Sequence, residues 1–347
     1  MVQAKTSHAD QVTTLKNTAN DEHLIRDYLK NREFLANDLK AFWTVVVTIC
    51  FHVFALWTYF GLNSPCLFVV TYALVFIRWF MIFHDCTHLS FWENKTWCIY
   101  FGKLLSCLVF TPYTYWRTNH ILHHENSGDQ TSTKYNFNDT IPLTVRQYVF
   151  LPSWKRYLYR FGRDPIIFFT IIPFIHFFIM NRFKKGAFIT NVSVPLHCYF
   201  FYYFGGIHLI MLFVMTMILA SSGGFILFHF QHTYNPTYIN NIANKYSKFD
   251  ASLRGSSHII IPPILKWFTL GIEYHHIHHL TTRIPCYNLE HVHKKAPPCS
   301  WNNIFVFDSF HKIIDSLGKT LWDEEQHRFV GFSEISQEFE KIVLIIQ

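Results

Sequence analysis

The chain has 347 residues, of which 50% are hydrophobic, 19% are aromatic and only 15% are charged. This composition is too apolar for an ordinary soluble domain, and it predicts an integral membrane protein. The formal net charge of +7 comes from Lys and Arg that flank the apolar runs, with no basic block that contains interleaved aromatics. The charge therefore favours contact with an anionic membrane surface and argues against a nucleic-acid partner.

The two ends of the chain are polar and enclose one apolar domain. Residues 1–40 lack the short apolar run of a signal peptide, so we expect a cytosolic N-terminal tail there. Residues 41–330 are expected to form the membrane domain, and residues 331–347 a C-terminal tail. The eight cysteines form no C-x-x-C pair and no disulfide-like spacing, which predicts free thiols.

Two apolar stretches open the membrane domain. Residues 41–60 carry no formal charge and match the roughly 20 residues that cross the hydrocarbon core of a bilayer. Residues 66–83 follow after a turn, and their single charge, Arg78, lies near the end of the stretch, where its long side chain can reach the interface. Both stretches are predicted to be transmembrane helices.

The middle of the chain contains shorter apolar runs and one very long one. Residues 97–110 and 166–180 have only 14 or 15 residues, which favours interfacial or re-entrant helices over spans. Residues 187–230 form a long apolar stretch interrupted by a pair of glycines. This interruption predicts a helical hairpin with crossings near residues 189–204 and 207–228.

Four spans place both termini on the same side of the membrane. The basic residues 182–185 would face outward if residues 166–180 also crossed, against the positive-inside bias. The predicted fold is therefore all-α, an integral membrane protein with four transmembrane helices. A helical cap, the histidine-rich site described next and both termini are expected on the cytosolic side.

The 22 histidines are concentrated in three motifs, HDCTH, HILHH and HHIHH. Their spacings of i, i+3 and i+4 allow the rings of each motif to project from one broad helix face. Neutral imidazole is the commonest metal ligand among side chains, and the number of rings exceeds the roughly six ligands of one ion, so we expect two metal ions. The expected ligands are His84, His88, His120, His123, His124, His275, His278 and His279, together with His232 at the cytosolic end of the last span.

The other histidines lack this pattern. Four that lie singly in apolar stretches are expected to make local hydrogen bonds, and they are His52, His176, His197 and His208. Those expected on the surface or in loops include His258 and His293. His276 lies about 100° around the helix from His275 and is left out of the metal site. His229 and His276 nevertheless stay open as alternative ligands.

Metal-bound histidines usually donate their second ring N–H to a carboxylate or a carbonyl group. Five acidic residues lie next to the motifs or shortly after them in the sequence. The candidates for this outer role are Asp85, Glu125, Asp129, Glu273 and Glu290.

The three motifs, in this order and at these separations, resemble those of the integral-membrane fatty acyl desaturases. The flanking segments YWRTNHILHH, FHFQH and WFTLGIEYHHIHHLTTRIPCYNL look most like the omega-6 (delta-12) acyl-lipid branch. This resemblance extends from about residue 40 to about residue 320. It implies two iron ions held by the eight motif histidines and His232, which use O2 and two electrons to introduce a cis double bond into an acyl chain.

The resemblance also implies the partners of the reaction. The substrate would be a fatty acyl lipid or an acyl thioester. The chain has no H-P-G-G heme motif and no ferredoxin-like cysteine pattern, so a separate donor, cytochrome b5 or ferredoxin with its reductase, would supply the electrons. The membrane would be the endoplasmic reticulum or a bacterial inner membrane.

A C–H bond within a fatty chain has no acidic proton for a general base, so the protein's part is to position the chain beside the metals. Four aromatic residues near the motifs are expected to line an apolar tunnel, namely Trp79, Phe83, Trp116 and Phe228.

Two other functions remain open. One is a di-iron hydroxylase or ketolase of an alkyl, sphingolipid or carotenoid substrate. The other is a non-enzymatic metal carrier, although a carrier would place ionisable groups facing one another inside the bilayer.

Overall fold

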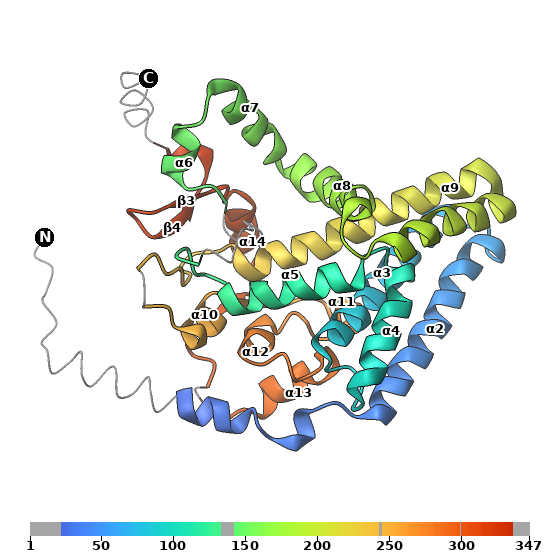
Figure 1. Cartoon of the computed structure of the whole chain (residues 1–347), viewed down its shortest axis with the longest axis horizontal. Coiled ribbons are helices and arrows are strands. Elements are labelled where there is room, and N and C mark those ends of the chain that lie inside the picture. Colours follow the sequence, from blue (N-terminus) through green and yellow to red (C-terminus); the bar gives the residue numbers. More distant parts are fainter. Residues whose placement is uncertain (1–21, 133–141, 243–244, 299, 336–347) are drawn as a thin grey trace, which may run out of the picture.

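The computed structural model describes residues 22–132, 142–242, 245–298 and 300–335. The outer parts of the two predicted tails and Cys299 therefore lie outside the described residues. The chain is mostly helical. Long helices form one end of the molecule, and short helices and strands form the other (Figure 1).

The first two predicted spans correspond to α2 (Asp38–Phe60) and α3 (Pro65–His88). The side chain of Asn37 caps α2 by accepting from the backbone N–H of Lys40, and Pro65 opens α3 in the first turn, where its missing N–H costs nothing. Arg78 does not reach the interface, because it is only 4% exposed. Its guanidinium donates to Thr48 Oγ1 and to the carbonyl oxygen of Trp267.

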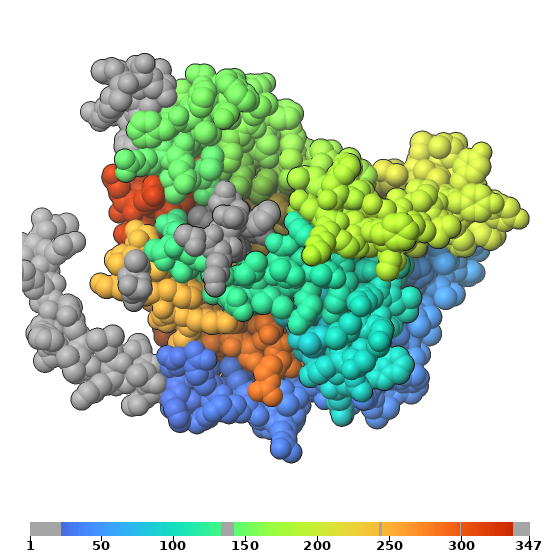
Figure 2. Space-filling model, in the orientation of Figure 1, coloured from blue at the N-terminus to red at the C-terminus, as the bar shows by residue number. Residues whose placement is uncertain are grey.

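The predicted hairpin corresponds to α9 (Phe188–His232), which is divided at Gly206. Gly206 has φ 61° and ψ −156°, a conformation available essentially to glycine alone. The rings of Phe201 and Phe213 stack at 4.5 Å, whereas one straight helix would separate them by about 18 Å. The glycine turn therefore folds α9 into two arms, and these arms form the projecting end of the molecule in Figure 2.

The shorter apolar runs form shorter helices. Residues 97–110 fall in α4 (Lys95–Leu108). Residues 166–180 form a π-helical turn (Ile167–Ile171) followed by α8 (Ile172–Phe178). Before this turn lies α7 (Ser153–Gly162), and α7 meets the segment Ile167–Phe183 at an angle of 69°.

Within the described residues, three helices are long and apolar enough to cross a membrane, and the bent α7–α8 pair would make a fourth if it were a single span. The three are Arg32–Phe60, which includes α2, together with α3 and α9. These helices are the features of a protein associated with membranes.

The other end of the molecule consists of short elements. The helices are α5 (Tyr113–Asn126), α6 (Val145–Val149), α10 (Lys248–Arg254), α11 (Pro263–Thr269), α12 (His275–Leu280), α13 (Cys286–Lys295) and α14 (Phe310–Leu317). The strands are β1 (Ser257–Ile259), parallel to β2 (Phe305–Phe307), and β3 (Leu321–Asp323), antiparallel to β4 (Arg328–Val330). The described chain is mostly helical, as predicted, and these two small sheets are the part of the fold that the sequence did not predict. Each strand has three residues, too few for an alternating pattern to appear in the sequence.

The conformation of Gly206 generates a prediction about stability. An ideal Cβ at this position would meet no atom within 4 Å, so Gly206→Ala introduces backbone strain without a clash. We expect the variant to be about 1–3 kcal/mol less stable, measured as a lower temperature of unfolding in detergent. Gly162→Ala is the matched control, because its Cβ also meets open space and its φ is not positive. Equal effects of the two substitutions would contradict this account of the turn.

Candidate metal centre

Four helices bring the nine predicted histidines together. The last turn of α3 carries His84 and His88, and the last residue of α9 is His232. The remaining six lie on α5 and α12, three on each helix. Residues from distant parts of the chain therefore meet where α3 and α9 end.

The nine histidines form two groups in which the candidate ligand atoms lie within 4.8 Å of one another. The five-histidine group consists of His84, His88, His120, His124 and His278. The four-histidine group consists of His123, His232, His275 and His279. Each i, i+4 pair of α5 and α12 stays in one group, and the third histidine of each helix joins the other group. The spacing within each motif therefore places its histidines in two different groups. Rings that all projected from one helix face would not reach both groups.

The distances between ring nitrogens fit coordination of a metal ion. Nε2–Nε2 distances in the five-histidine group are 2.8 Å for His84–His120, 3.2 Å for His120–His124 and 3.0 Å for His124–His278. In the four-histidine group, His275 Nε2 lies 3.0 Å from both His232 Nε2 and His279 Nε2. Metal–nitrogen bonds of about 2.1 Å at right angles would place neighbouring nitrogens about 3.0 Å apart.

The protonation of these rings also suits a metal. Desolvation lowers the pKa of the histidines on α5 and α12 well below its usual value, and neighbouring histidines lower it further for His120, His123, His124, His275, His278 and His279. The rings are therefore neutral, the form that donates a lone pair. His88 Nε2 is buried with no hydrogen-bond partner in the described structure. A cation between the rings would accept lone pairs from several of these nitrogens at once.

In two of the histidines, the Nδ1 atom contacts an oxygen atom that orients the ring. The carbonyl oxygen of Gly255 lies 3.1 Å from His232 Nδ1. A carbonyl only accepts, so this contact puts the proton on Nδ1 and leaves the lone pair on Nε2. His84 Nδ1 lies 3.2 Å from Asp85 Oδ1. Cys286 fixes this carboxylate, donating from its backbone N–H to Oδ2 at 2.7 Å and from its thiol to Oδ1 at 2.9 Å.

Sequence reasoning did not single out Cys286, because it lies about 200 residues from Asp85 and belongs to no motif. Among the described residues, none of the other four acidic candidates hydrogen-bonds to a histidine of the two groups. Glu125 is exposed. Asp129 accepts from the backbone N–H and the hydroxyl of Thr131, and Glu290 forms an ion pair with Lys294. Glu273 is fully buried and accepts from Thr269 Oγ1 at 2.6 Å.

Neither alternative ligand belongs to the two groups. His229 donates from Nε2 to the carbonyl oxygen of Ser316 at 3.0 Å. His276 faces away from both groups, with Nε2 3.4 Å from His293 Nδ1. His258 was expected at the surface but is buried, because β1 pairs with β2 and its ring stacks on Tyr274 at 4.4 Å.

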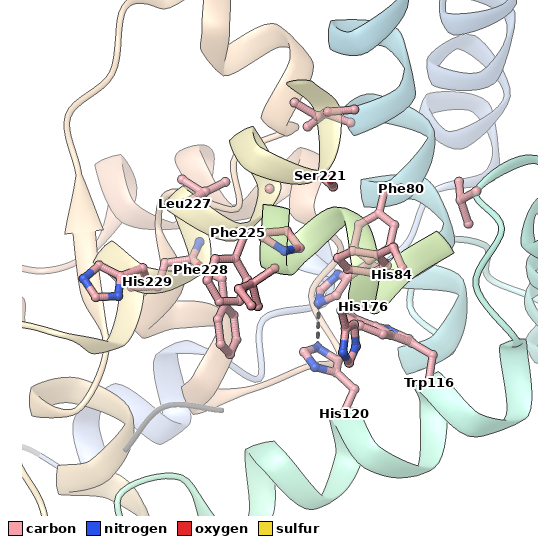
Figure 3. A pocket seen from close by; sticks show the side chains of 18 of the residues that line it. Phe80, His84, Trp116, His120, His176, Ser221, Phe225, Leu227, Phe228 and His229 are labelled. Atoms are coloured by element: carbon pink, nitrogen blue, oxygen red, sulfur yellow. Dashed lines mark hydrogen bonds between the residues drawn. The ribbon is translucent and has the colours of Figure 1, made fainter. Parts of the chain in front are cut away.

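A cavity of about 300 Å³ borders both groups (Figure 3). Its wall includes His84 and His120 of the five-histidine group and His275 of the four-histidine group. The rest of the wall is mainly apolar, with Phe76, Phe80 and Phe225 among the lining residues. The cavity can therefore bring an apolar molecule next to both candidate metal positions.

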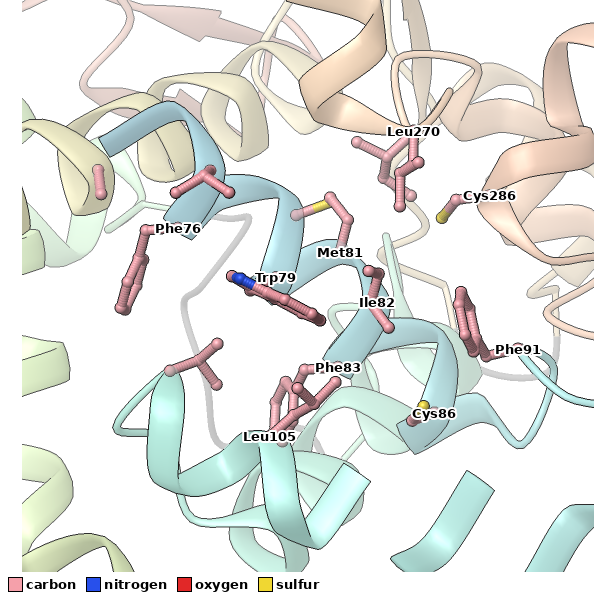
Figure 4. Packing of buried hydrophobic residues seen from close by; sticks show 14 of the residues in the cluster. Phe76, Trp79, Met81, Ile82, Phe83, Cys86, Phe91, Leu105, Leu270 and Cys286 are labelled. Carbon is pink, nitrogen blue, oxygen red and sulfur yellow. The ribbon is translucent and has the colours of Figure 1, made fainter. Parts of the chain in front are cut away.

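Two of the four expected aromatic residues, Trp116 and Phe228, line the cavity. Trp79 and Phe83 do not, because they lie on another side of α3 and pack in the apolar core (Figure 4). The indole of Trp79 donates to His52 Nδ1 at 3.1 Å. Sequence proximity to a motif did not reveal which side of the helix faces the cavity.

Comparison with known proteins gives a consistent result. The family model described as fatty acid desaturase matches residues 62–307. A fatty acid desaturase of Bacillus subtilis is 33% identical over 298 residues, 81% of this chain and 83% of that protein. A chloroplastic omega-6 fatty acid desaturase of Arabidopsis thaliana is 25% identical over 78% of this chain and 62% of its own length. An sn-1 oleoyl-lipid 12-desaturase of Picosynechococcus is 23% identical over 89% of this chain and 92% of its own length.

The two groups predict how metal content responds to substitution. His279→Ala removes a nitrogen from the four-histidine group, so we expect bound metal to fall from two ions per chain to one or fewer, measured by elemental analysis of the purified protein. His276→Ala is the control, since it changes a buried ring on the same helix that faces away from both groups. Equal metal loss in the two variants would argue against the grouping.

The contacts of Asp85 predict a second effect. Asp85→Asn weakens the acceptor behind His84, and we expect metal affinity to fall about 10- to 100-fold, measured by titrating metal-free protein with Co2+. Cys286→Ser retains a hydroxyl donor and the backbone N–H, so this variant should bind nearly as tightly as the parent. An Asp85→Asn protein with unchanged affinity would show that the carboxylate has only a packing role.

Proposed function

The chain belongs to the fatty acid desaturase family of oxidoreductases, and on that premise we propose that it introduces a cis double bond into an acyl chain with omega-6 (delta-12)-like selectivity. The observation that carries the proposal is the apolar cavity that touches histidines of both groups. An unactivated alkyl chain offers no polar handle near the reacting carbons. An apolar wall next to two metal positions is what such a substrate requires.

The nine histidines are the proposed ligands of two iron ions, one for each group. When bound, the iron pair supplies, with O2 and two electrons, the oxidising power that removes two hydrogens from the chain. The protein's own residues position the acyl chain and exclude water. The walls of the cavity align the acyl chain beside His84, His120 and His275, and the burial of the histidines keeps bulk water away from the reacting carbons.

The proposed topology has four crossings, formed by α2, α3 and the two arms of α9. The metal site and both termini would then face the cytosol, with α4, α7 and α8 at the interface. Exposed apolar side chains on the long helices support contact with lipid. They include Phe42, Trp43, Val53 and Trp57 of α2 and Leu196, Tyr203, Ile207 and Met215 of α9. The membrane would be the endoplasmic reticulum or a bacterial inner membrane, and the electrons would come from cytochrome b5 or ferredoxin with its reductase.

The proposal predicts a new lipid in a suitable host. Yeast that expresses the chain together with an electron donor should accumulate acyl chains with one additional cis double bond, located by mass spectrometry of the extracted lipids. The His124→Ala variant should give none, because it lacks a proposed ligand, and immunoblotting would establish that it is present in the membrane at parental level. Unchanged lipids in the parent strain, with iron, O2 and donor supplied, would refute the assignment.

The same samples separate desaturation from oxygenation. Growth under 18O2 would label the organic product of a hydroxylase or ketolase, whereas the product of a desaturase carries no 18O. Label in the modified acyl chain would replace the proposed function by the oxygenase alternative.

A further inference from the structure

An apolar run stays exposed at the end of the molecule that holds the short helices and strands. Residues 260–265, between β1 and the first turn of α11, read IIPPIL and carry no charge. Five of these six residues are exposed, and Ile264 is 72% exposed. Single exposed apolar side chains are normal on a protein surface, but a contiguous group of them marks a surface that binds another apolar surface.

The exposed run continues onto the start of α14. Because β1 and β2 run parallel, the chain leaves both strands at the same edge of the sheet. There the backbone N–H of Ile260 donates to the carbonyl oxygen of Phe307 at 2.9 Å. The first residue of α14, Phe310, follows shortly after β2 and is 76% exposed. Five exposed apolar side chains around this edge form the α11–α14 patch, namely Ile260, Ile264, Leu265, Phe310 and Ile314.

The contacts of α11 indicate what covers this patch. The ring of Phe51, near the middle of α2, lies 5.3 Å from the ring of Trp267 and 5.0 Å from that of Phe268. Arg78 of α3 donates to the carbonyl oxygen of Trp267. α11 is therefore held against two helices that are long and apolar enough to cross a membrane (Figure 1). Side chains on its outer face continue the surface that α2 exposes to lipid.

The run can enter lipid at a low cost in unpaired polar groups. Pro262 and Pro263 have no backbone N–H, and the N–H of Leu265 donates to the carbonyl oxygen of Pro262 at 2.9 Å. Unpaired backbone donors are costly in hydrocarbon, so these features matter there. The next charge along the chain, Lys266, has its Nζ atom 3.7 Å from Oε1 of Glu290. The lysine is thus paired with a carboxylate of α13.

We propose that the α11–α14 patch inserts among the acyl chains of the cytosolic leaflet and forms a membrane contact in addition to the long helices. This inference rests on the crossing by α2 in the proposed function and does not depend on the reaction. α12 begins six residues after α11 ends and carries three candidate metal ligands. The patch would therefore hold α12 at a defined height relative to the membrane surface.

Photocrosslinking from single positions tests this contact. The photoreactive residue p-benzoylphenylalanine would replace Ile264 or Phe310 in the full chain, which would be purified, reconstituted into phosphatidylcholine nanodiscs and irradiated. Mass spectrometry would then identify the adducts. Both positions should yield adducts on lipid acyl chains, because the excited benzophenone reacts with C–H bonds that it contacts.

Two positions of similar exposure are the matched controls. Val53, on α2, is 60% exposed, and Leu24, in the predicted cytosolic N-terminal segment, is 65% exposed. The same replacement should give acyl-chain adducts at Val53 and none at Leu24. If Ile264 or Phe310 gave no lipid adduct while Val53 did, or gave adducts with headgroups alone, the proposal would be wrong.

Two other results would also overturn the proposal. Adducts between two copies of the chain at Ile264 and Phe310 would identify the patch as a protein–protein interface. Loss of lipid adducts at Val53 as well would show that the proposed crossing by α2 is wrong. The second result is distinct from failure of the patch alone, because in that case Val53 still reacts with lipid.

Discussion

The structure depends on bringing nine imidazole rings, eight of them buried, into two groups whose candidate ligand atoms lie within 4.8 Å of one another. A neutral ring has one N–H and one lone pair, and His88 Nε2 and the Nδ1 atoms of His124, His275 and His278 are buried with no hydrogen-bond partner among the described residues. Such a cluster is unfavourable as a packed core but favourable as a cage for cations. The ends of α3 and α9 and the whole of α5 and α12 are arranged around this one requirement.

The periodicity of the α-helix explains how two short motifs serve two centres. On α5, His120 and His124 are four residues apart and join one group, whereas His123, offset by about 100° from His124, joins the other. On α12 the assignment to the groups is reversed, because the pair His275 and His279 joins the four-histidine group and His278 joins the other. Two neighbouring straight helices can therefore contribute to both groups. Each helix places its i, i+4 pair in one group and its remaining histidine, His123 or His278, in the other.

The sequence predicted features that depend on local pattern. The apolar stretches gave the long helices, and the glycine pair gave the turn of α9 at Gly206. Contacts between distant segments were not predictable in this way. The thiol of Cys286 reaches Asp85 only because α13 packs near the end of α3, and Arg78 is satisfied by Trp267 rather than by the interface. Strand pairs of three residues and the side of α3 that faces the cavity depend on the assembled fold in the same manner.

The cavity connects two features that lie far apart in the sequence, the histidine groups and the apolar walls. In the proposed function, the histidine groups would set where a C–H bond reacts, and the apolar walls would set the path of the chain. Phe76, Phe80 and His84 lie four residues apart on one face of α3, so the same helix supplies part of the apolar wall and a candidate ligand.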